Sequence, residues 1–483
     1  MKRILATTAI ALCSTAPLAA AVELPAILSD NMILQQQTDA TLWGWAEADK
    51  EVTITASWLT QQPLTTQAND DGYWEAKIAT PTASYDPQWI TFDDGDIVRR
   101  DNILIGEVWF ASGQSNMEMP LNGFWNCPIE GGNEAIATAA QHPGVRFVNV
   151  ERPNGEETRY KVHKRTGGEW QLPTPGNAQR WSATAYYYAR MMTQTLNVPV
   201  GVISCAWGGS WVEGWLPREI VETYKDIDLD KQMKHIKTDD GGEYWLYSSP
   251  IVMYNGMLKP VSHYTIKGFL WYQGESNVGR EKDYPTRLKT MVELWRDHFD
   301  NDELPFYIVE IAPWRYGNGI SAALFRESQH KASQLIPHSA FVCTNDMVYP
   351  HELNQIHPRK KEEIGKRLAY TALEKTYGIE GIVSTSPSYK SMTITGDTIE
   401  VAFNNAAEGL SPWNDITGFE LAGEDRIFHP ATATLNESKK TIWVHSAEVP
   451  APVAVRYCFR DFQIGNLQNH RCLPVIPFRS DNW

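Results

Sequence analysis

The sequence predicts an α/β protein with a parallel central sheet, helices on both of its faces, and a β-rich domain on either side. Short apolar runs alternate with helical patterns over residues 103–378, and such alternation builds parallel sheets. Before and after this segment, short strands are separated by turn residues. We therefore expect four segments: residues 1–21, 22–102, 103–378 and 379–483.

Residues 1–21 have the layout of a secretory signal peptide. Lys2 and Arg3 precede an apolar stretch that ends near Leu12, and small residues lead to a cleavage site near Ala20 or Ala21. The apolar stretch is too short to span a bilayer. The sequence thus predicts a soluble mature protein, periplasmic or secreted, with no membrane span.

The two flanking domains read as small β-sandwiches. In the first, strands are expected at residues 41–45, 52–56 and 73–78, with a turn at 69–72 before the last of them. In the second, residues 392–401 predict a hairpin and residues 452–457 a further strand.

The central segment carries the pattern of a buried parallel sheet. Apolar runs that predict its strands lie at residues 103–111, 145–150, 198–204, 268–272, 306–311 and 340–343. Helices are expected from the N-cap Ser182 to Leu196, over residues 284–299 and 321–335, and from Pro358 onward.

Composition narrows the partners. The formal net charge of −15 would repel DNA or RNA, so no nucleic-acid partner is expected. The nineteen tryptophans favour a carbohydrate substrate, because indole rings often stack on sugar rings. Five cysteines follow the signal segment; Cys458 and Cys472 are expected to form a disulfide, whereas Cys205 and Cys343 end apolar runs and are expected as buried thiols. No spacing predicts a metal site, and no cofactor is expected.

Residues suited to ester hydrolysis follow four of the predicted strands. Ser115 comes just after the first strand, and a glycine pair follows another. Gln273 and Asn277 offer amide donors, and His357 precedes a predicted helix. Since parallel strands meet at one edge of a sheet, a nucleophile, a base and oxyanion donors are expected together there.

The same segments resemble a known family. They are Gly106–Trp109, Gln114–Met119, Trp207–Ser210 with Trp215, Tyr254–Met257, Trp271–Asn277, Ile356–Pro358, and near the ends Leu24–Pro25, Ser29–Gln35, Leu473–Pro474 and Pro477–Asp481. With these the chain resembles the sialate O-acetylesterases of the SGNH (GDSL-like) hydrolase superfamily. The resemblance implies a three-layer, flavodoxin-like SGNH core.

It also implies a role for each site residue. Ser115 would take the acetyl group, and His357 would accept its proton. The N–H groups of Ser115 and of Gly209 or Gly208 would stabilise the oxyanion, together with the side-chain amide of Gln273 or, as a second choice, Asn277. Asn116, Trp207 and Glu275 are expected at the substrate, although Trp207 could equally pack in the core and Glu275 could support its loop.

One position departs from the family pattern. Many relatives place an aspartate three residues before the histidine, to orient the imidazole. Here that position is Asn354, which cannot carry a negative charge. Asp346 and Glu352 are candidate substitutes, and a Ser–His dyad is the alternative.

The sequence therefore predicts a carbohydrate O-acetylesterase acting through an acetyl-serine. The acetylated sugar could be sialic acid, with Arg359 as a possible partner for its carboxylate, or a xylan- or xyloglucan-type polysaccharide. The competing interpretation is a non-catalytic carbohydrate-binding protein on a degenerate esterase scaffold. The oligomeric state is open.

Overall fold

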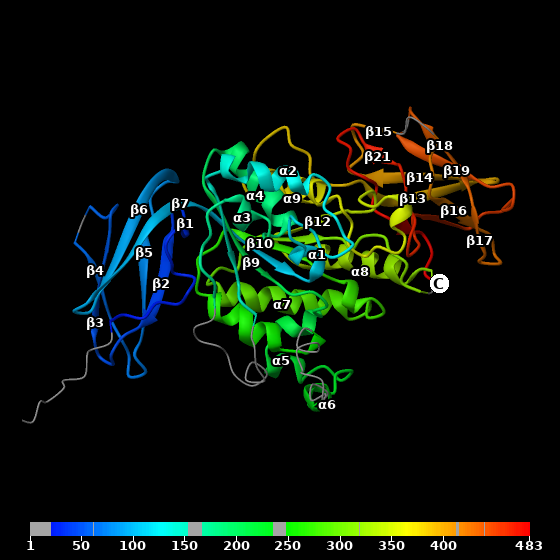
Figure 1. The fold of residues 1–483 in the computed structure, drawn as a ribbon. Coiled ribbons are helices and arrows are strands. Elements are labelled where there is room, and N and C mark those ends of the chain that lie inside the picture. The colour runs from blue at the N-terminus through cyan, green and yellow to red at the C-terminus, as the bar shows by residue number, and fades with distance from the viewer. Residues whose placement is uncertain are drawn as a thin grey trace, which may run out of the picture.

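The structure is a computed structural model that describes residues 21–60, 62–152, 167–234, 248–317, 319–411, 415–438 and 440–483. The predicted signal peptide lies, apart from residue 21, outside the described residues. Three parts follow one another along the molecule: N-terminal strands, a central α/β body and C-terminal strands (Figure 1). Within the described residues, no helix combines the length and apolarity that a membrane crossing requires.

The central sheet is parallel, as predicted. Its strands lie in the order β8 (Val145–Asn149), β9 (Val200–Ala206), β7 (Ile97–Gly113), β10 (Gly268–Tyr272), β11 (Phe306–Val309) and β12 (Ser339–Val342). β9, β10 and β11 are buried along their whole length, because helices cover the sheet on both faces.

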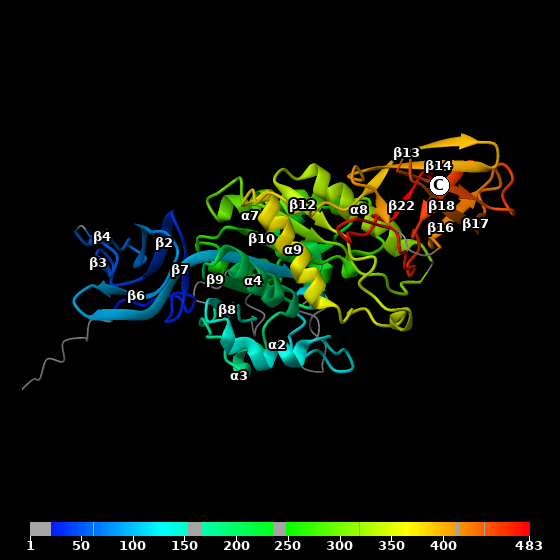
Figure 2. The same cartoon turned by 90° about the horizontal axis from the view of Figure 1, so that it is seen from above.

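Two helix pairs provide this cover. They are α4 (Ala183–Leu196) with α9 (Lys361–Lys375) on one face and α7 (Tyr284–His298) with α8 (Ser321–Leu335) on the other (Figure 2). Ser182 caps α4 as predicted, with its hydroxyl accepting from the N–H of Ala185 at 3.2 Å. α9 begins at Lys361, three residues after the predicted start at Pro358.

Alternate residues of β7 face the two helix pairs. Trp109 packs beneath α4, with its ring centroid 5.3 Å from that of Tyr188. The next residue, Phe110, packs against Trp295 of α7 at 5.8 Å. This period of two places one apolar cluster on each face of the sheet and fixes the register of β7.

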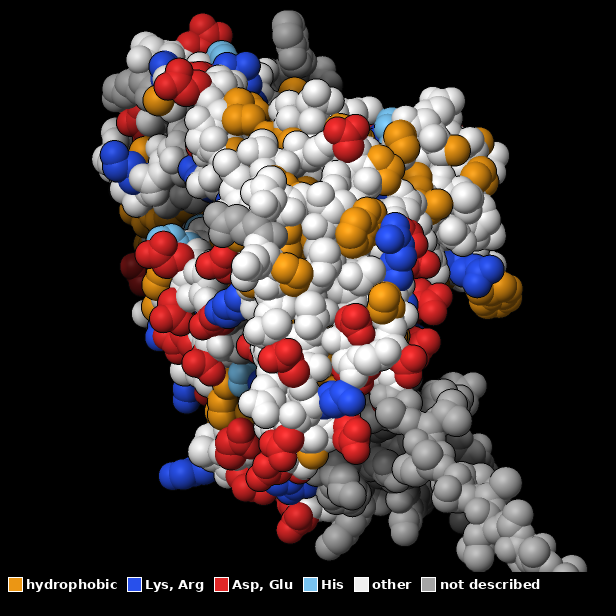
Figure 3. All heavy atoms as spheres, turned by 90° about the vertical axis from the view of Figure 1, so that its left-hand side faces the viewer, with side chains coloured by type: hydrophobic (Ala, Val, Ile, Leu, Met, Phe, Trp, Pro, Cys, Tyr) orange, Lys and Arg blue, Asp and Glu red, His pale blue; other side chains and the backbone are white. Residues whose placement is uncertain are grey.

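The N-terminal part consists of strands, as predicted. They are β1 (Ile33–Gln35), β2 (Asp39–Trp45), β3 (Glu51–Ala56), β4 (Leu64–Gln67), β5 (Tyr73–Ala79) and β6 (Ser84–Asp93). β6 pairs with the first half of β7, so one strand runs through the boundary predicted between residues 102 and 103. Figure 3 looks onto this end of the molecule, where acidic side chains gather over the lower half of the view.

The C-terminal part contains two four-stranded antiparallel sheets around a shared core. Its strands are β13 (Ser388–Thr395), β14 (Thr398–Asn404), β15 (Leu410–Ser411), β16 (Phe419–Ala422), β17 (Phe428–Pro430), β18 (Thr432–Asn436), β19 (Thr441–His445), β20 (Ala454–Tyr457), β21 (Gln468–Asn469) and β22 (Phe478–Arg479). β13 and β14 form the predicted hairpin.

The pairing of Cys458 with Cys472 is not found, because both cysteines are free. The Cys458 thiol is buried and packs closely on Gly418 and Gly465, whereas Cys472 is exposed. Cys205 and Cys343 are buried free thiols, as predicted.

Short helical turns complete the described fold. They are α1 (Ser115–Glu118), α2 (Gly132–Thr138), η1 (Ala139–Gln141), α3 (Pro175–Ala178), η3 (Val212–Trp215), α5 (Arg218–Val221), α6 (Leu229–Lys234), η5 (Tyr254–Leu258), η6 (Lys259–Val261), η7 (Glu275–Asn277) and η8 (Pro350–Glu352). Three of them (α1, η3 and η7) follow carboxyl ends of the sheet and position the candidate site.

Candidate active site

Ser115 stands at the end of β7, where the chain turns sharply into α1. Gly113 makes the turn with φ +133°, and a Cβ there would lie 2.1 Å from the carbonyl oxygen of Tyr272 on β10. Only glycine fits this close approach. The Gln114 side chain then accepts from the N–H groups of Gly274 and Ser276 at 3.1 and 3.3 Å, which ties the Ser115 turn to the loop after β10.

His357 reaches Ser115 from the segment between η8 and α9. Its Nε2 lies 2.8 Å from the Ser115 Oγ, within hydrogen-bonding distance. Phe124 packs edge-on against the imidazole, with the ring centroids 5.2 Å apart. Burial, followed by the positive charge of Lys361, lowers the pKa of His357 to about 4. The imidazole is therefore neutral at pH 7 and can accept the Ser115 proton.

A buried polar network lies behind these two residues. The Asn116 amide donates to a carboxylate oxygen of Glu275 and, at 3.1 Å, to the carbonyl of Ile356, the residue before His357. The Asn116 oxygen accepts from the Lys361 ammonium at 2.5 Å. All of Asn116 is buried, so it supports the His357 segment from beneath instead of facing solvent.

Burial perturbs both charged members of this network. The pKa of Lys361 falls to about 7, because burial outweighs the attraction of Glu275. Burial likewise raises the pKa of Glu275. Opposite shifts of this kind cluster at functional sites, and here they surround the candidate base.

Two backbone N–H groups stand out in the turns that follow β7 and β9. Among the described residues, the N–H groups of Ser115 and Gly209 have no acceptor. Gly209 lies in the left-handed region with φ +78°, in the turn after β9. The neighbouring Gly208 differs, since its N–H donates to the Glu118 carboxylate at 2.6 Å. Of the predicted glycine pair, Gly209 is thus the member whose backbone N–H remains available to bind a ligand oxygen.

Gln273 and Asn277 lie in a buried network of hydrogen bonds. Gln273 uses both amide protons, one on the Ser210 carbonyl at 3.0 Å and one on the Asn277 oxygen at 2.7 Å. Asn277 donates to the buried carboxylate of Glu213 at 3.1 Å. This geometry leaves Gln273 no proton for an oxyanion, because neighbouring loop groups satisfy the amide first.

Neither candidate acid contacts His357. The two Asp346 oxygens accept from the Arg367 guanidinium of α9 at 2.8 and 2.6 Å. The Glu352 oxygens accept from the N–H of Tyr349 and from the Arg359 side chain, both at 2.9 Å. Each carboxylate is thus held by an arginine, and neither has a hydrogen bond to His357 within the described chain.

Trp207 lies beside the Ser115 turn on the strand-end loop of β9. The Arg152 guanidinium stacks over its ring at 5.2 Å and pairs with Glu118 at 2.6 Å. The indole is partly buried and packs at the edge of the apolar cluster on the α7–α8 face, which matches the alternative of core packing in part. Glu275, by contrast, is buried and bonded to Asn116, which matches its alternative role as a support of the loop.

Sequence reasoning missed several residues around Ser115 and His357. Cys127 lies 3.8 Å from the second imidazole nitrogen, and Lys361 approaches from the first turn of α9. Glu118 takes one glycine N–H. No local pattern marks these residues, because each becomes relevant through a contact with a distant segment; only Lys361, one turn beyond His357 at the start of a helix, had a usable positional signal.

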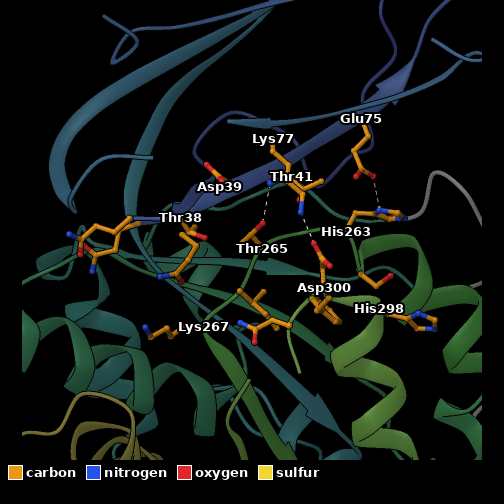
Figure 4. A pocket seen from close by; sticks show the side chains of 17 residues that line it. Thr38, Asp39, Thr41, Glu75, Lys77, His263, Thr265, Lys267, His298 and Asp300 are labelled. Carbon is orange, nitrogen blue, oxygen red and sulfur yellow. Dashed lines mark hydrogen bonds and ion pairs between the residues drawn. The ribbon is translucent and has the colours of Figure 1, made fainter. Parts of the chain in front are cut away.

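A polar cavity of about 600 Å³ lies elsewhere, between the N-terminal strands and the central body. Lys77 and Asp300 pair across it, as do Glu75 and His263 (Figure 4). Lys267, which lines it, directly precedes β10, whereas Ser115 follows the carboxyl end of β7. The cavity is therefore at the opposite edge of the sheet and takes no part in the Ser115 site.

A family model agrees with this geometry. Residues 105–374 match the model described as carbohydrate esterase, sialic acid-specific acetylesterase. The chain belongs to this family. It is accordingly a carboxylic ester hydrolase of the carbohydrate esterase type, and the matched residues include both Ser115 and His357.

Known relatives of this esterase share most of its length. Mouse sialate O-acetylesterase is 23% identical and covers 93% of each chain. The human enzyme is 24% identical over 74% of this chain and 72% of its own. A crystal structure of a carbohydrate acetylesterase from Xanthomonas citri superposes with a TM-score of 0.82 at 30% identity, covering 96% of this chain and 100% of the other.

Proposed function

We propose that this esterase is exported and removes O-acetyl groups from sugars through an acetyl-serine intermediate. The observation that carries the proposal is the 2.8 Å contact of Ser115 Oγ with His357 Nε2, together with two backbone N–H groups that have no acceptor in the described part of the chain. Nucleophile, base and oxyanion donors are the three parts that acyl transfer requires. Export is proposed from residues 1–21 alone.

The chemistry follows from these positions. Ser115 Oγ attacks the acetyl carbon as its proton passes to His357 Nε2. The carbonyl oxygen gains negative charge between the N–H groups of Ser115 and Gly209. His357 then returns the proton to the sugar oxygen, which leaves as a hydroxyl. A water molecule, deprotonated by the same imidazole, releases acetate and restores Ser115.

We infer that the sugar is neutral and derived from an acetylated polysaccharide. A sialate would bring a carboxylate that needs a cation. Arg359 is paired with Glu352 at 2.9 Å, and Arg152 is paired with Glu118 at 2.6 Å. Among the described residues, these two arginines near the site are therefore already paired with carboxylates, which disfavours an anionic sugar.

Two tryptophans provide apolar surface for such a sugar. Trp125 is 89% exposed, and it lies on the loop between Phe124, which packs on His357, and Cys127. Trp207 follows β9, and its backbone N–H donates to the Gly113 carbonyl beside Ser115. Indole faces suit the C–H faces of pyranose rings, so these side chains can hold the sugar that carries the acetyl group.

The test is acetate release from a panel of acetylated xylan, xyloglucan, pectin and sialic acids, with 4-nitrophenyl acetate as a general ester. Ser115→Ala is expected to lose about 10⁴-fold or more in kcat, and Ser276→Ala, on the neighbouring loop, serves as the matched control. Absence of acetate release from every ester would contradict the enzyme mechanism and favour a non-catalytic carbohydrate-binding protein. Faster release from sialic acids than from the polysaccharides would contradict the neutral-sugar assignment alone.

A further inference from the structure

The second ring nitrogen of His357 is Nδ1. The group that bonds Nδ1 decides whether the imidazole holds the tautomer that can accept the Ser115 proton. To accept the Ser115 proton at Nε2, the neutral imidazole must carry its own proton at Nδ1. In most triads an aspartate holds that proton in place. Here the Nδ1 atom lies 3.8 Å from the Cys127 Sγ, within hydrogen-bonding distance for sulfur. Among the described side chains, Cys127 is the polar neighbour that bonds this nitrogen.

Gln355 fixes the direction of the thiol. Its Oε1 lies 3.2 Å from the Cys127 Sγ and also accepts the backbone N–H of His357 at 3.2 Å. The Gln355 amide nitrogen donates to the Asn126 carbonyl at 3.3 Å, which sets the orientation of the amide. Because an amide oxygen cannot donate, the S–H of Cys127 must point to it. The sulfur lone pairs are then free to face His357.

We propose that Cys127, oriented by Gln355, is the positioning residue of His357 and takes the place of the triad acid. Hydrogen bonds then run in one direction, from the Ser115 hydroxyl to His357, from His357 Nδ1–H to the Cys127 sulfur, and from the Cys127 S–H to Gln355. The proposal rests on the serine mechanism proposed above. Cys127 is 9% exposed, so solvent competes little for its contacts.

The proton count shows what such a thiol can do. When Ser115 attacks, its proton moves to His357 Nε2 and the imidazolium keeps its Nδ1 proton on Cys127. Cys127 keeps its own proton throughout, and no charge appears on sulfur. A thiol therefore fixes the tautomer and ring orientation but stabilises the imidazolium less than a carboxylate does.

Charged groups on the surrounding elements also influence His357 and must stay unchanged when Cys127 is tested. Lys361 of α9 acts directly on the imidazole, and Glu275 of η7 reaches the same segment through Asn116. Neither contacts Cys127 by a hydrogen bond within the described residues. Lys361 is nevertheless within electrostatic reach of position 127. Neutral substitutions at Cys127 thus change the Nδ1 partner without breaking a hydrogen bond of this network, whereas an aspartate there also adds a charge that acts on Lys361.

The test compares Cys127→Ala, Cys127→Ser and Cys127→Asp by kcat/KM for 4-nitrophenyl acetate across pH, with Cys472→Ser as the exposed control. Alanine should lower kcat on the order of 10- to 100-fold with little change in KM, less than the ~10⁴-fold of an aspartate replacement. Serine should stay within several-fold of the parent. Aspartate should move the acid limb up by about 1–3 pH units, since it stabilises the imidazolium.

A readout without turnover separates this proposal from the serine mechanism. Nitrogen-15 NMR of His357, assigned with His357→Gln, should show the Nδ1–H tautomer in the parent and a tautomer mixture in Cys127→Ala. Parental kcat, pH profile and tautomer in Cys127→Ala would overturn the role of Cys127. If alanine unfolds the chain, an unshifted acid limb in Cys127→Asp overturns it instead. A parent that shows the tautomer but releases no acetate would overturn only the proposed function.

Discussion

Replacing Lys361 with methionine should move the acid limb of the pH–rate profile upward. The limb reports the pKa of His357, because only the neutral imidazole accepts the Ser115 proton. Burial and the Lys361 charge together lower that pKa from 6.5 to about 4. At this pH Lys361 is protonated, since its own pKa is about 7. Methionine has a similar volume and keeps the pocket filled without the charge.

The size of the shift follows from the order of the two causes. Burial is the larger one and persists in the variant. Removal of the charge should therefore raise the pKa of His357 by less than half of that decrease, on the order of one pH unit. At pH 5 the parent should keep about nine-tenths of its plateau kcat/KM, whereas the variant should keep about half.

The assay is hydrolysis of 4-nitrophenyl acetate between pH 3.5 and 8, with each rate normalised to its own plateau. Normalisation removes any loss of absolute rate from the broken contact to Asn116. Lys360→Met is the matched control, because Lys360 lies one residue away and donates to the Asp346 carbonyl outside the His357 pocket. An acid limb that stays in place or moves down in Lys361→Met would refute the electrostatic coupling to His357.

Three further predictions address other parts of the site. Asp346→Asn should lower the free energy of unfolding by about 2 kcal/mol, which is less than the loss of a fully buried ion pair would cost, because Asp346 is 28% exposed. The acid limb of the pH–rate profile should stay unchanged, and a shift of that limb would restore Asp346 as the orienting acid. Gly209→Ala should lower kcat on the order of 10²-fold, because alanine resists φ +78° and displaces an oxyanion N–H; an unchanged kcat would remove Gly209 from the hole. Trp125→Ala should raise KM for an acetylated oligosaccharide about 10-fold without affecting 4-nitrophenyl acetate, and equal effects on both esters would contradict a sugar contact.

Local sequence patterns were sufficient to predict the strands and helices. They were insufficient to predict which site residues bond to one another. The apolar runs at β9 and β10 and the capped helix α4 follow from periodicity and side-chain chemistry within a few residues. The start of α9 was predicted three residues early, because Pro358 favours a first turn but does not require one.

The oxyanion donors and the orienting acid show why pairings are harder. Gln273 and Asp346 have suitable chemistry near strand ends, but an amide or carboxylate bonds to whichever partner the fold brings closest. For Gln273 that partner is the loop carrying Ser210, and for Asp346 it is Arg367. Neither contact can be read from the residues that flank the side chain in sequence.

The sequence by itself determined the parallel α/β core, the β-rich flanks, and the placement of Ser115 and His357 near one edge of the sheet. These depend on short-range periodicity, on turn residues, and on the rule that parallel strands end together. Only the tertiary structure decided what surrounds His357: Lys361 above Asn116, and Cys127 held by Gln355 beside the second nitrogen. Cys127 and His357 are 230 residues apart in the chain, so no local preference could have predicted their contact.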